Sequence, residues 1–268
     1  MLFLYELPRW LMGVTVVAAT LGLAYAGYFV FHRVWRTVST DDNKTVALAV
    51  LAVVAMINSL LLAFAAVSVW EDFTSAEEAV VEEADTVSEL ARDFAIYDSV
   101  QSREALRLLH EYADMVVNVE WRNLQRGEAN VDVGNQFDRM FVAVGTLEPD
   151  TPRRSALLPE IWERTNELLK HRRGRLHTSE ARVSGTLWSV VLLGTMLTML
   201  ISYVLPRTPF NLWIIGAIAA SIGLVFFLII AMDRPFAGEE GVSPEPFESA
   251  ISNIQRRHPD IARPAPVE

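Results

Sequence analysis

The stretch TVALAVLAVVAMINSLLLAFAAVSVW, Thr45–Trp70, runs for 26 residues without a charged side chain. A helix needs roughly 20 apolar residues to cross the hydrocarbon core of a bilayer. Three further windows are equally free of charge: Leu11–Phe31, Val183–Leu205 and Thr208–Met232. The sequence therefore predicts an all-α integral membrane protein with four transmembrane helices, and it excludes a soluble globular enzyme.

The first window also has an interpretation as a cleaved signal peptide. Arg9 precedes it, and Ala24-Tyr25-Ala26 has the small-residue form of a cleavage site. The apolar stretch continues through Phe31, however, which makes it longer than the roughly 7–15 residues that a signal peptide uses. We therefore predict that residues 11–31 form the first span.

The second window is expected to continue as a helix beyond the membrane. No glycine or proline lies between Tyr28 and Arg126, so nothing forces a break. As a helix, Thr45–Trp70 would be about 39 Å long, against a hydrocarbon core of roughly 30 Å. Beyond Trp70 an apolar stripe recurs at spacings of three and four, and it needs a packing partner. The stripe consists of Ala76, Val80, Ala84, Val87, Ala91 and Phe94.

Residues 71–182 predict a helical domain inserted between the second and third spans. Its further helices are one capped by Ser99 or Ser102 and ending near Gly127, one around Gln136–Leu147, and one beginning at Thr151-Pro152. The last two spans, 183–205 and 208–232, are joined by a tight turn. Six of the twelve prolines fall in the tail, residues 233–268, and we expect disorder beyond Ser249.

Lysines and arginines near the spans predict the orientation, because they are enriched on the cytoplasmic side. Four crossings place the N-terminus, residues 71–182 and the tail on one side. That side carries Arg9, Arg164, Lys170, Arg172, Arg173, Arg175, Arg182 and Arg234, and the other carries Arg33, Arg36, Lys44 and Arg207. We therefore expect a multi-pass protein of the cell inner (plasma) membrane with both termini in the cytoplasm. The Lys170–Arg175 run is interpreted as a topology determinant or, alternatively, as an anionic-lipid or ligand patch.

No catalytic residue or metal ligand set is predicted. The sequence has no cysteine, and its five histidines never fall at a metal-binding spacing. The spans contain no ionisable residue, which argues against a proton-coupled transporter or pump because such machines need ionisable groups inside the membrane. The lack of ionisable residues does not exclude passive conduction of ions.

The spans do contain small and weakly polar residues. Repeats at four-residue spacing suit close helix contact, and they comprise Ala18, Gly22 and Ala26, Gly216 and Ala220, and Ala219 and Gly223. Asn58 lies in the middle of the second span. It predicts either a hydrogen bond between helices or a polar group that faces a pore.

An acidic stretch follows the second span and contains only one base, Arg92. Residues 71–182 hold 23 acids and 14 bases, a net charge of −9. Such a run is either a solvated helix face or the lining of a vestibule. A vestibule lined by acids focuses the electric field and raises the local concentration of cations. The residues proposed for the mouth of that vestibule are Glu71, Asp72, Glu77 and Glu78.

Four short elements carry a resemblance to a known family. They are W-E-D-F-T-S-A (Trp70–Ala76), E-W (Glu120–Trp121), R-R-G-R-L (Arg172–Leu176) and D-R-P-F-A-G-E-E-G-V-S-P-E-P-F (Asp233–Phe247). Together they resemble the bacterial bestrophin-like membrane proteins of unknown function, over roughly residues 45–250. The resemblance implies four spans, a helical cytoplasmic domain and a pentameric channel whose second helix lines the pore. The residues that narrow such a pore would then lie at Ile57, Asn58, Leu60, Leu61 and Phe64.

The element after the fourth span carries a second implication. Asp233, Arg234 and Pro235 are expected to end the span, and Phe236 to pack back against the helical domain. Bestrophins have a P-F-G-acidic element at this place, near which calcium binds, and Pro235, Phe236, Gly238, Glu239 and Glu240 are similar to it. Ala237 interrupts the order and only two acids follow, whereas calcium takes six to eight oxygen ligands. We therefore expect no cofactor. Calcium is the one ion that the resemblance suggests.

Two function classes follow from these observations. The first is a homo-oligomeric ion channel that conducts inorganic ions passively and gates by dewetting of an apolar ring. The resemblance implies a channel that is selective for anions, whereas the net negative charge of residues 71–182 favours cations. The second is a non-conducting membrane scaffold or sensor that binds a cytoplasmic partner through its acidic domain. The lipid bilayer is a partner in both classes, and nucleic acid in neither.

Overall fold

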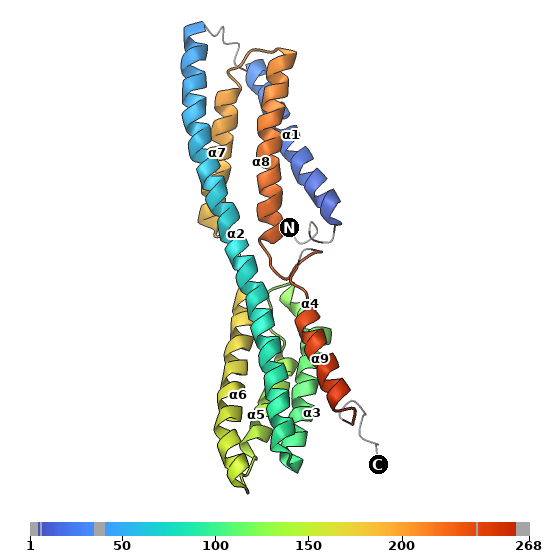
Figure 1. Ribbon diagram of the computed structural model, residues 1–268. Coiled ribbons are helices and arrows are strands. Elements are labelled where there is room, and N and C mark those ends of the chain that lie inside the picture. The colour runs from blue at the N-terminus through green and yellow to red at the C-terminus, as the bar shows by residue number, and fades with distance from the viewer. Residues whose placement is uncertain (1–4, 6, 35–40, 240, 261–268) are drawn as a thin grey trace. The chain divides into compact units, whose positions relative to one another are not determined.

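The structure, a computed structural model, describes residue 5 and residues 7–34, 41–239 and 241–260. Every regular element in these ranges is a helix (Figure 1). The elements are α1 (Arg9–Val34), α2 (Asp41–Tyr97), α3 (Val100–Met115), the π-helical turn η2 (Val116–Glu120), α4 (Trp121–Leu124), α5 (Val131–Gly145), α6 (Pro152–Ser179), α7 (Gly185–Ser202), α8 (Pro209–Met232) and α9 (Glu245–Arg257).

The helices belong to two compact units. The first unit comprises Met1–Asp72, Arg182–Asp233 and Gly238–Glu240, and the second comprises Phe73–Ala181, Arg234–Ala237 and Gly241–Glu268. As expected from the lack of glycine and proline, α2 continues without a break for 57 residues and contributes to both units.

The first unit contains the helices that were predicted as spans. Among the residues that the structure describes, four helices, α1, α2, α7 and α8, are long and apolar enough to cross a membrane. Inside this unit α1 packs along α8, and Tyr25 and Tyr28 of α1 donate hydrogen bonds to the carbonyl oxygens of Leu212 and Leu205. Tyr28 thus reaches the turn between α7 and α8, and Tyr25 reaches the first turn of α8, which begins at Pro209.

Glycines of the first unit lie where helices approach closely. A Cβ added at Gly216 or Gly223 of α8 would collide with Tyr25 or Thr20 of α1. The small-residue repeats on α8 therefore mark a helix contact, as predicted. At Gly22 a Cβ would meet no atom within 4 Å, so this glycine makes no close helix contact within the described chain. Periodicity alone could not tell which small residues face a neighbouring helix.

Gly216→Ala is expected to destabilise the first unit, by about 1–3 kcal/mol, because the added methyl group must displace the Tyr25 hydroxyl from Leu212. Thermal unfolding of the purified protein in detergent measures the effect. Gly22→Ala is the matched control, since its methyl group enters open space. A melting temperature lowered equally by both substitutions would contradict the close contact.

The second unit buries the apolar stripe of α2. Ala76, Val80, Ala84, Val87, Ala91 and Phe94 are at most 4% exposed and belong to one core with side chains of α3, α5, α6 and α9. The predicted caps also form. Ser99 caps α3 in a reciprocal box with Ser102, and Thr151 caps α6. Near Gly127, which has a φ of 73°, the chain leaves α4.

The tail differs from its prediction. Disorder beyond Ser249 is wrong for the residues up to Arg257, because α9 continues to that point and buries Phe247, Ala250 and Ile254 in the core of the second unit. Proline content suggested an unfolded segment. The spacing of three and four, with Glu245 in the first turn and Arg257 in the last, is the helix signal that the prediction missed.

Candidate functional site

The residues predicted to narrow a pore lie on two sides of α2. Ile57, Leu60 and Phe64 are 53%, 58% and 62% exposed. Spacings of three and four place them on one face of the helix. Leu61 instead packs, partly buried, against the core of the first unit. The structure therefore brings three of the five candidates onto one exposed apolar face.

Asn58 lies away from that face. Its side chain is 3% exposed, and its Nδ2 lies 3.5 Å from Oγ1 of Thr195 on α7. A Cβ at Gly194 would collide with the amide oxygen of Asn58, so this glycine gives the asparagine its space. This position matches the interpretation as a polar contact between helices, and it does not place Asn58 with the exposed candidates.

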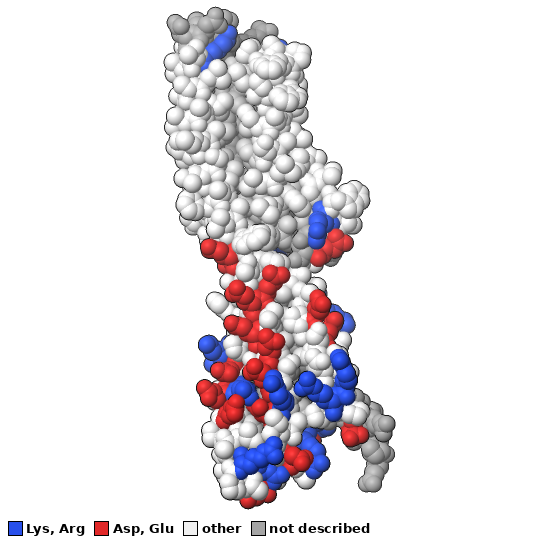
Figure 2. All heavy atoms as spheres, viewed as in Figure 1, with Lys and Arg blue, Asp and Glu red and all other residues white. Residues whose placement is uncertain are grey.

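The predicted acidic mouth lies on the part of α2 that follows the apolar stretch. Glu71, Glu77 and Glu78 are exposed, and Asp72 is half-buried. On the face drawn in Figure 2, acidic side chains gather over the second half of α2, whereas its first half carries almost no charge. One helix thus presents an apolar surface followed by an acidic surface.

A buried ion-pair network lies inside the second unit. Arg175 of α6 contacts Oε2 of Glu83 at 2.6 Å and Oε2 of Glu120 at 2.8 Å, and Arg172 contacts the same Glu120 oxygen at 2.9 Å. Tyr112 donates its hydroxyl hydrogen to Glu83. The charges balance, and three of the four charged side chains are fully buried. Such a network holds α2, α3, η2 and α6 in one register because each charge is costly without its partner.

The protonation states in this network follow from burial and charge. Burial alone would raise the pKa of Glu120, but hydrogen bonds and charge from Arg172 and Arg175 outweigh it and hold the pKa below its usual value. Burial, then the charge of Glu83, raises the pKa of Tyr112 well above its usual value. Glu120 is therefore ionised and Tyr112 neutral at pH 7.

Glu120 should make the second unit sensitive to acid. Because its pKa is lower in the folded state, its contribution is present above the unfolded carboxyl pKa of about 4.3 and is lost as the pH falls below it. Melting temperatures measured in detergent between neutral and acidic pH should fall less steeply for Glu120→Gln than for the wild type. Glu167→Gln, at an exposed position of α6, is the control and should keep the wild-type slope.

The network rules out one of the two interpretations of the Lys170–Arg175 run, the anionic-lipid or ligand patch, for Arg172 and Arg175. Arg172 and Arg175 are 6% and 0% exposed, so they cannot form a surface patch for lipid or ligand. Lys170 and Arg173 stay exposed. The spacing of three between the two buried arginines places both on the face that carries Ile161, Thr165 and Leu168.

Three of the four elements that carry the family resemblance contribute residues to this network or pack beside it. The turn η2 ends at Glu120, and a π-helical turn is a rare insertion that often marks a functional position in a helix. Next to it, the Trp121 ring stands edge-on to Phe236 at 5.6 Å and to Phe247 at 6.3 Å between ring centres. The guanidinium of Arg175 lies over the Phe247 ring. Phe236 thus packs into the core of the second unit, as predicted.

The remaining residues of the predicted element that follows α8 make backbone contacts. Asp233 caps the end of α8 and accepts a hydrogen bond from the backbone N–H of Val183 at 2.7 Å. Pro235 accepts one from Val242, also at 2.7 Å. Arg234 is half-buried, Gly238 has a φ of 82°, and Glu239 accepts the backbone N–H of Arg9 at 3.0 Å. Glu240 lies outside the described residues.

These residues do not fit a calcium site. Within the described part of the chain, no group of three or more histidine, aspartate or glutamate side chains converges. The carboxylates of Asp233 and Glu239 already accept backbone hydrogen bonds. Calcium takes six to eight oxygen ligands, more than the two described carboxylates of this set supply by themselves.

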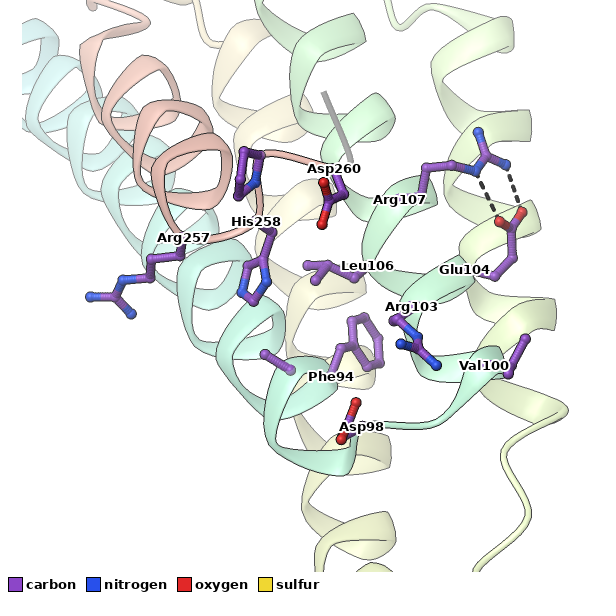
Figure 3. A pocket seen from close by; sticks show the side chains of 12 residues that line it. Phe94, Asp98, Val100, Arg103, Glu104, Leu106, Arg107, Arg257, His258 and Asp260 are labelled. Carbon is purple, nitrogen blue, oxygen red and sulfur yellow. Dashed lines mark hydrogen bonds and ion pairs between the residues drawn. The ribbon is translucent and has the colours of Figure 1, made fainter. Parts of the chain in front are cut away.

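A cavity of about 670 Å³ in the second unit was not predicted from the sequence. It lies among the end of α2, the start of α3 and the residues that follow α9 (Figure 3). Phe94 and Leu106 lie at its centre, and Arg107 turns toward Glu104. The other charged side chains that line it are Asp98, Arg103, Arg257 and Asp260, and His258 lies with them. Because both signs of charge line the cavity, its electrostatics select no class of ligand.

Comparisons with known proteins agree on one family. A model of the bestrophin-like domain matches residues 18–247. Two solved structures of variants of a bacterial bestrophin homologue from Klebsiella pneumoniae have TM-scores of 0.67 and 0.64 at 11% identity. They cover 92% and 96% of this chain, and 98% of their own. A crystal structure of a protein described as a membrane protein has a TM-score of 0.63 at 12% identity, covering 94% of this chain and 97% of its own. No curated protein matches the sequence.

Proposed function

The chain belongs to the bestrophin-like family of membrane proteins, and from this we propose that it forms a homo-oligomeric channel that conducts ions passively. In this proposal α2 helices from several copies surround an axis, with a pentamer as the assembly that kinship to bestrophins implies. Ile57, Leu60 and Phe64 point toward the axis and form an apolar ring that gates by dewetting.

The observation that carries this proposal is the exposed face of α2. A helix that only anchors a protein in lipid has no reason to follow its apolar face with a dense acidic run. The surface from Ile57 to Phe64 is apolar and exposed, and Glu71, Glu77 and Glu78 on the same helix are exposed and acidic. An apolar constriction followed by a charged vestibule is the arrangement that ion pores use.

The topology follows from the charge distribution. We propose that α1, α2, α7 and α8 cross the membrane and that residues 71–182 form a cytoplasmic domain inserted between the second and third crossings. The positive-inside rule supports cytoplasmic termini in the inner membrane. The excess of lysine and arginine on the cytoplasmic side does not depend on the buried Arg172 and Arg175. Without these two, that side still has six basic residues and the other side has four.

The acidic mouth is proposed to favour cations. The variant in which Glu71, Asp72, Glu77 and Glu78 are replaced by Gln or Asn should therefore shift the reversal potential toward anion preference. Planar bilayers with a salt gradient measure the shift. The shift should shrink as ionic strength rises, because screening at 0.15 M limits the range over which exposed charges act to about 8 Å.

A matched control removes the same number of charges at exposed positions of the second unit that lie outside the acidic mouth. The four exposed residues chosen are Glu128, Asp132, Glu163 and Glu167. Their neutralisation should leave the reversal potential unchanged. Equal shifts in both variants would show that net charge, and not the mouth, determines selectivity.

The oligomeric state and its symmetry test the channel proposal most directly. Purified protein imaged by electron microscopy should form a closed ring with an axial opening lined by α2. A monomer, or a ring whose axis lies away from α2, would overturn the proposal and favour a non-conducting scaffold or sensor that binds a partner through its acidic face.

A further inference from the structure

Two ion pairs join α6 to the acidic side of α2 within the second unit. Nε of Arg164 lies 3.3 Å from Oε2 of Glu89, and Nδ1 of His171 lies 3.0 Å from Oε2 of Glu82. The two bases are seven residues apart on α6 and the two acids are seven residues apart on α2, so the pairs repeat after about two helical turns. The same contact is therefore made twice, once by an arginine and once by a histidine.

Both acids belong to the exposed acidic face of α2. Acids recur along this face at spacings of four, three and four, and they are Glu78, Glu82, Asp85 and Glu89. The side chain of Glu82 is 61% exposed and that of Glu89 is 46% exposed. Glu78 is part of the proposed acidic mouth, and Glu82 lies on the same face one turn further along the helix.

The charged groups around the pair of His171 and Glu82 are of types whose ordinary pKa lies outside the range from pH 5 to 8. They are Glu78, Glu83 and Asp85 on α2, Glu167, Lys170, Arg172 and Arg175 on α6, Glu120 on η2, and Asp132, Asp138 and Arg139 on α5, which packs against α6. Histidine is the residue type that changes its charge within this range. In this cluster a change of pH near neutrality therefore acts on His171.

We propose that His171 is a proton sensor for the acidic vestibule, an inference that rests on the channel function proposed above. Its side chain is 20% exposed, so protons from the solvent reach it. Neutral His171 donates its Nδ1–H to Glu82 and leaves the charge of the carboxylate in place. A proton taken up from water at Nε2 makes the imidazolium ion, which offsets this charge as Arg164 offsets that of Glu89. The vestibule then concentrates cations less at acidic pH.

A contact that only holds α2 and α6 together is the alternative role for this pair. Replacing His171 would then change stability, but ion selectivity would not depend on pH. The position of Glu82 favours the sensor, because an exposed carboxylate acts on ions in the adjoining solution. Glu83, the next residue, is fully buried against Arg175 and is shielded from that solution.

Reversal potentials in planar bilayers test the proposal, measured across a salt gradient at about pH 8 and about pH 5.5. Low salt, about 0.01 M, gives a Debye length of about 30 Å, so single charges act on passing ions. The cation-to-anion permeability ratio of the wild type should fall about twofold at the acidic pH. A unit charge about 10 Å from an ion in water changes the local ion concentration by about that factor. Glu82→Gln should show the lower ratio already at the higher pH.

Variants with a fixed charge isolate His171. His171→Gln is neutral at both pH values and should keep the high ratio, whereas His171→Lys is positive at both and should keep the low ratio. His177→Gln is the matched control, because this exposed histidine lies six residues further along α6 and about 120° around the helix. It should retain the pH dependence of the wild type.

The outcomes separate this inference from the channel proposal. A wild type that conducts with the same permeability ratio at both pH values would overturn the proton sensor and leave the channel in place. An unchanged pH dependence in His171→Gln would do the same. Absence of current at both pH values would overturn the channel proposal, and the sensor with it.

Discussion

Replacing Leu60 or Phe64 of α2 with alanine is expected to raise the basal ion flux through the reconstituted protein. Water leaves a narrow apolar constriction, and ions cannot cross the dry segment. Removing apolar bulk from the face formed by Ile57, Leu60 and Phe64 widens the constriction and keeps it wet. Lowering the barrier by about 1.4 kcal/mol would raise the flux about tenfold.

Vesicles loaded with a fluorescent ion indicator measure this flux, and two controls isolate the effect. Leu193→Ala changes a side chain of α7 that is 61% exposed and lies outside the proposed pore. Leu61→Ala changes a residue of the same α2 turn that packs into the first unit. Neither should raise the flux by widening a pore. If the wild type, Leu60→Ala and Phe64→Ala were equally silent, the channel proposal would be falsified and the scaffold would replace it.

Loss of Arg175 is expected to destabilise the second unit by about 3–5 kcal/mol, because it leaves Glu83 and Glu120 buried without their shared cation. Arg175→Met keeps much of the side-chain volume and removes the charge. Urea or thermal unfolding in detergent measures the loss.

Arg173 provides the matched control for this prediction. It lies two residues away in the same basic run but is exposed, so Arg173→Met should change stability by no more than about 0.5 kcal/mol. Adding Glu83→Leu to Arg175→Met should recover part of the loss, because an apolar residue replaces the unpaired carboxylate. Equal effects of Arg173→Met and Arg175→Met would contradict a buried network.

The helices followed from local properties of the sequence. Charge-free windows gave the positions of α1, α7 and α8, and the lack of glycine and proline gave the unbroken α2. Caps at Ser99 and Thr151 were equally local, because a cap depends on residues within one turn. α9 was missed because proline content was weighed above the spacing of Phe247, Ala250 and Ile254.

The interior of the second unit could not be derived in this way. Glu83 and Glu120 lie 92 and 55 residues from Arg175, and a single sequence does not indicate which acid meets which base over such separations. For the same reason the sequence left a lipid or ligand patch as one interpretation of the run that contains Arg172 and Arg175. Asn58 shows the limit within the spans, since only the packing against Gly194 and Thr195 distinguishes its side of the helix.

The unbroken α2 also sets a rule for insertions and deletions. Its buried positions Leu62, Val69, Ala76, Leu90 and Tyr97 differ by multiples of seven. Within the second unit, one residue added after Ala76 would turn Leu90 and Tyr97 by about 100° around the helix axis, away from the face that packs into the core. A single-residue insertion between Ala76 and Leu90 should therefore be rejected, even though the inserted residue could be helical.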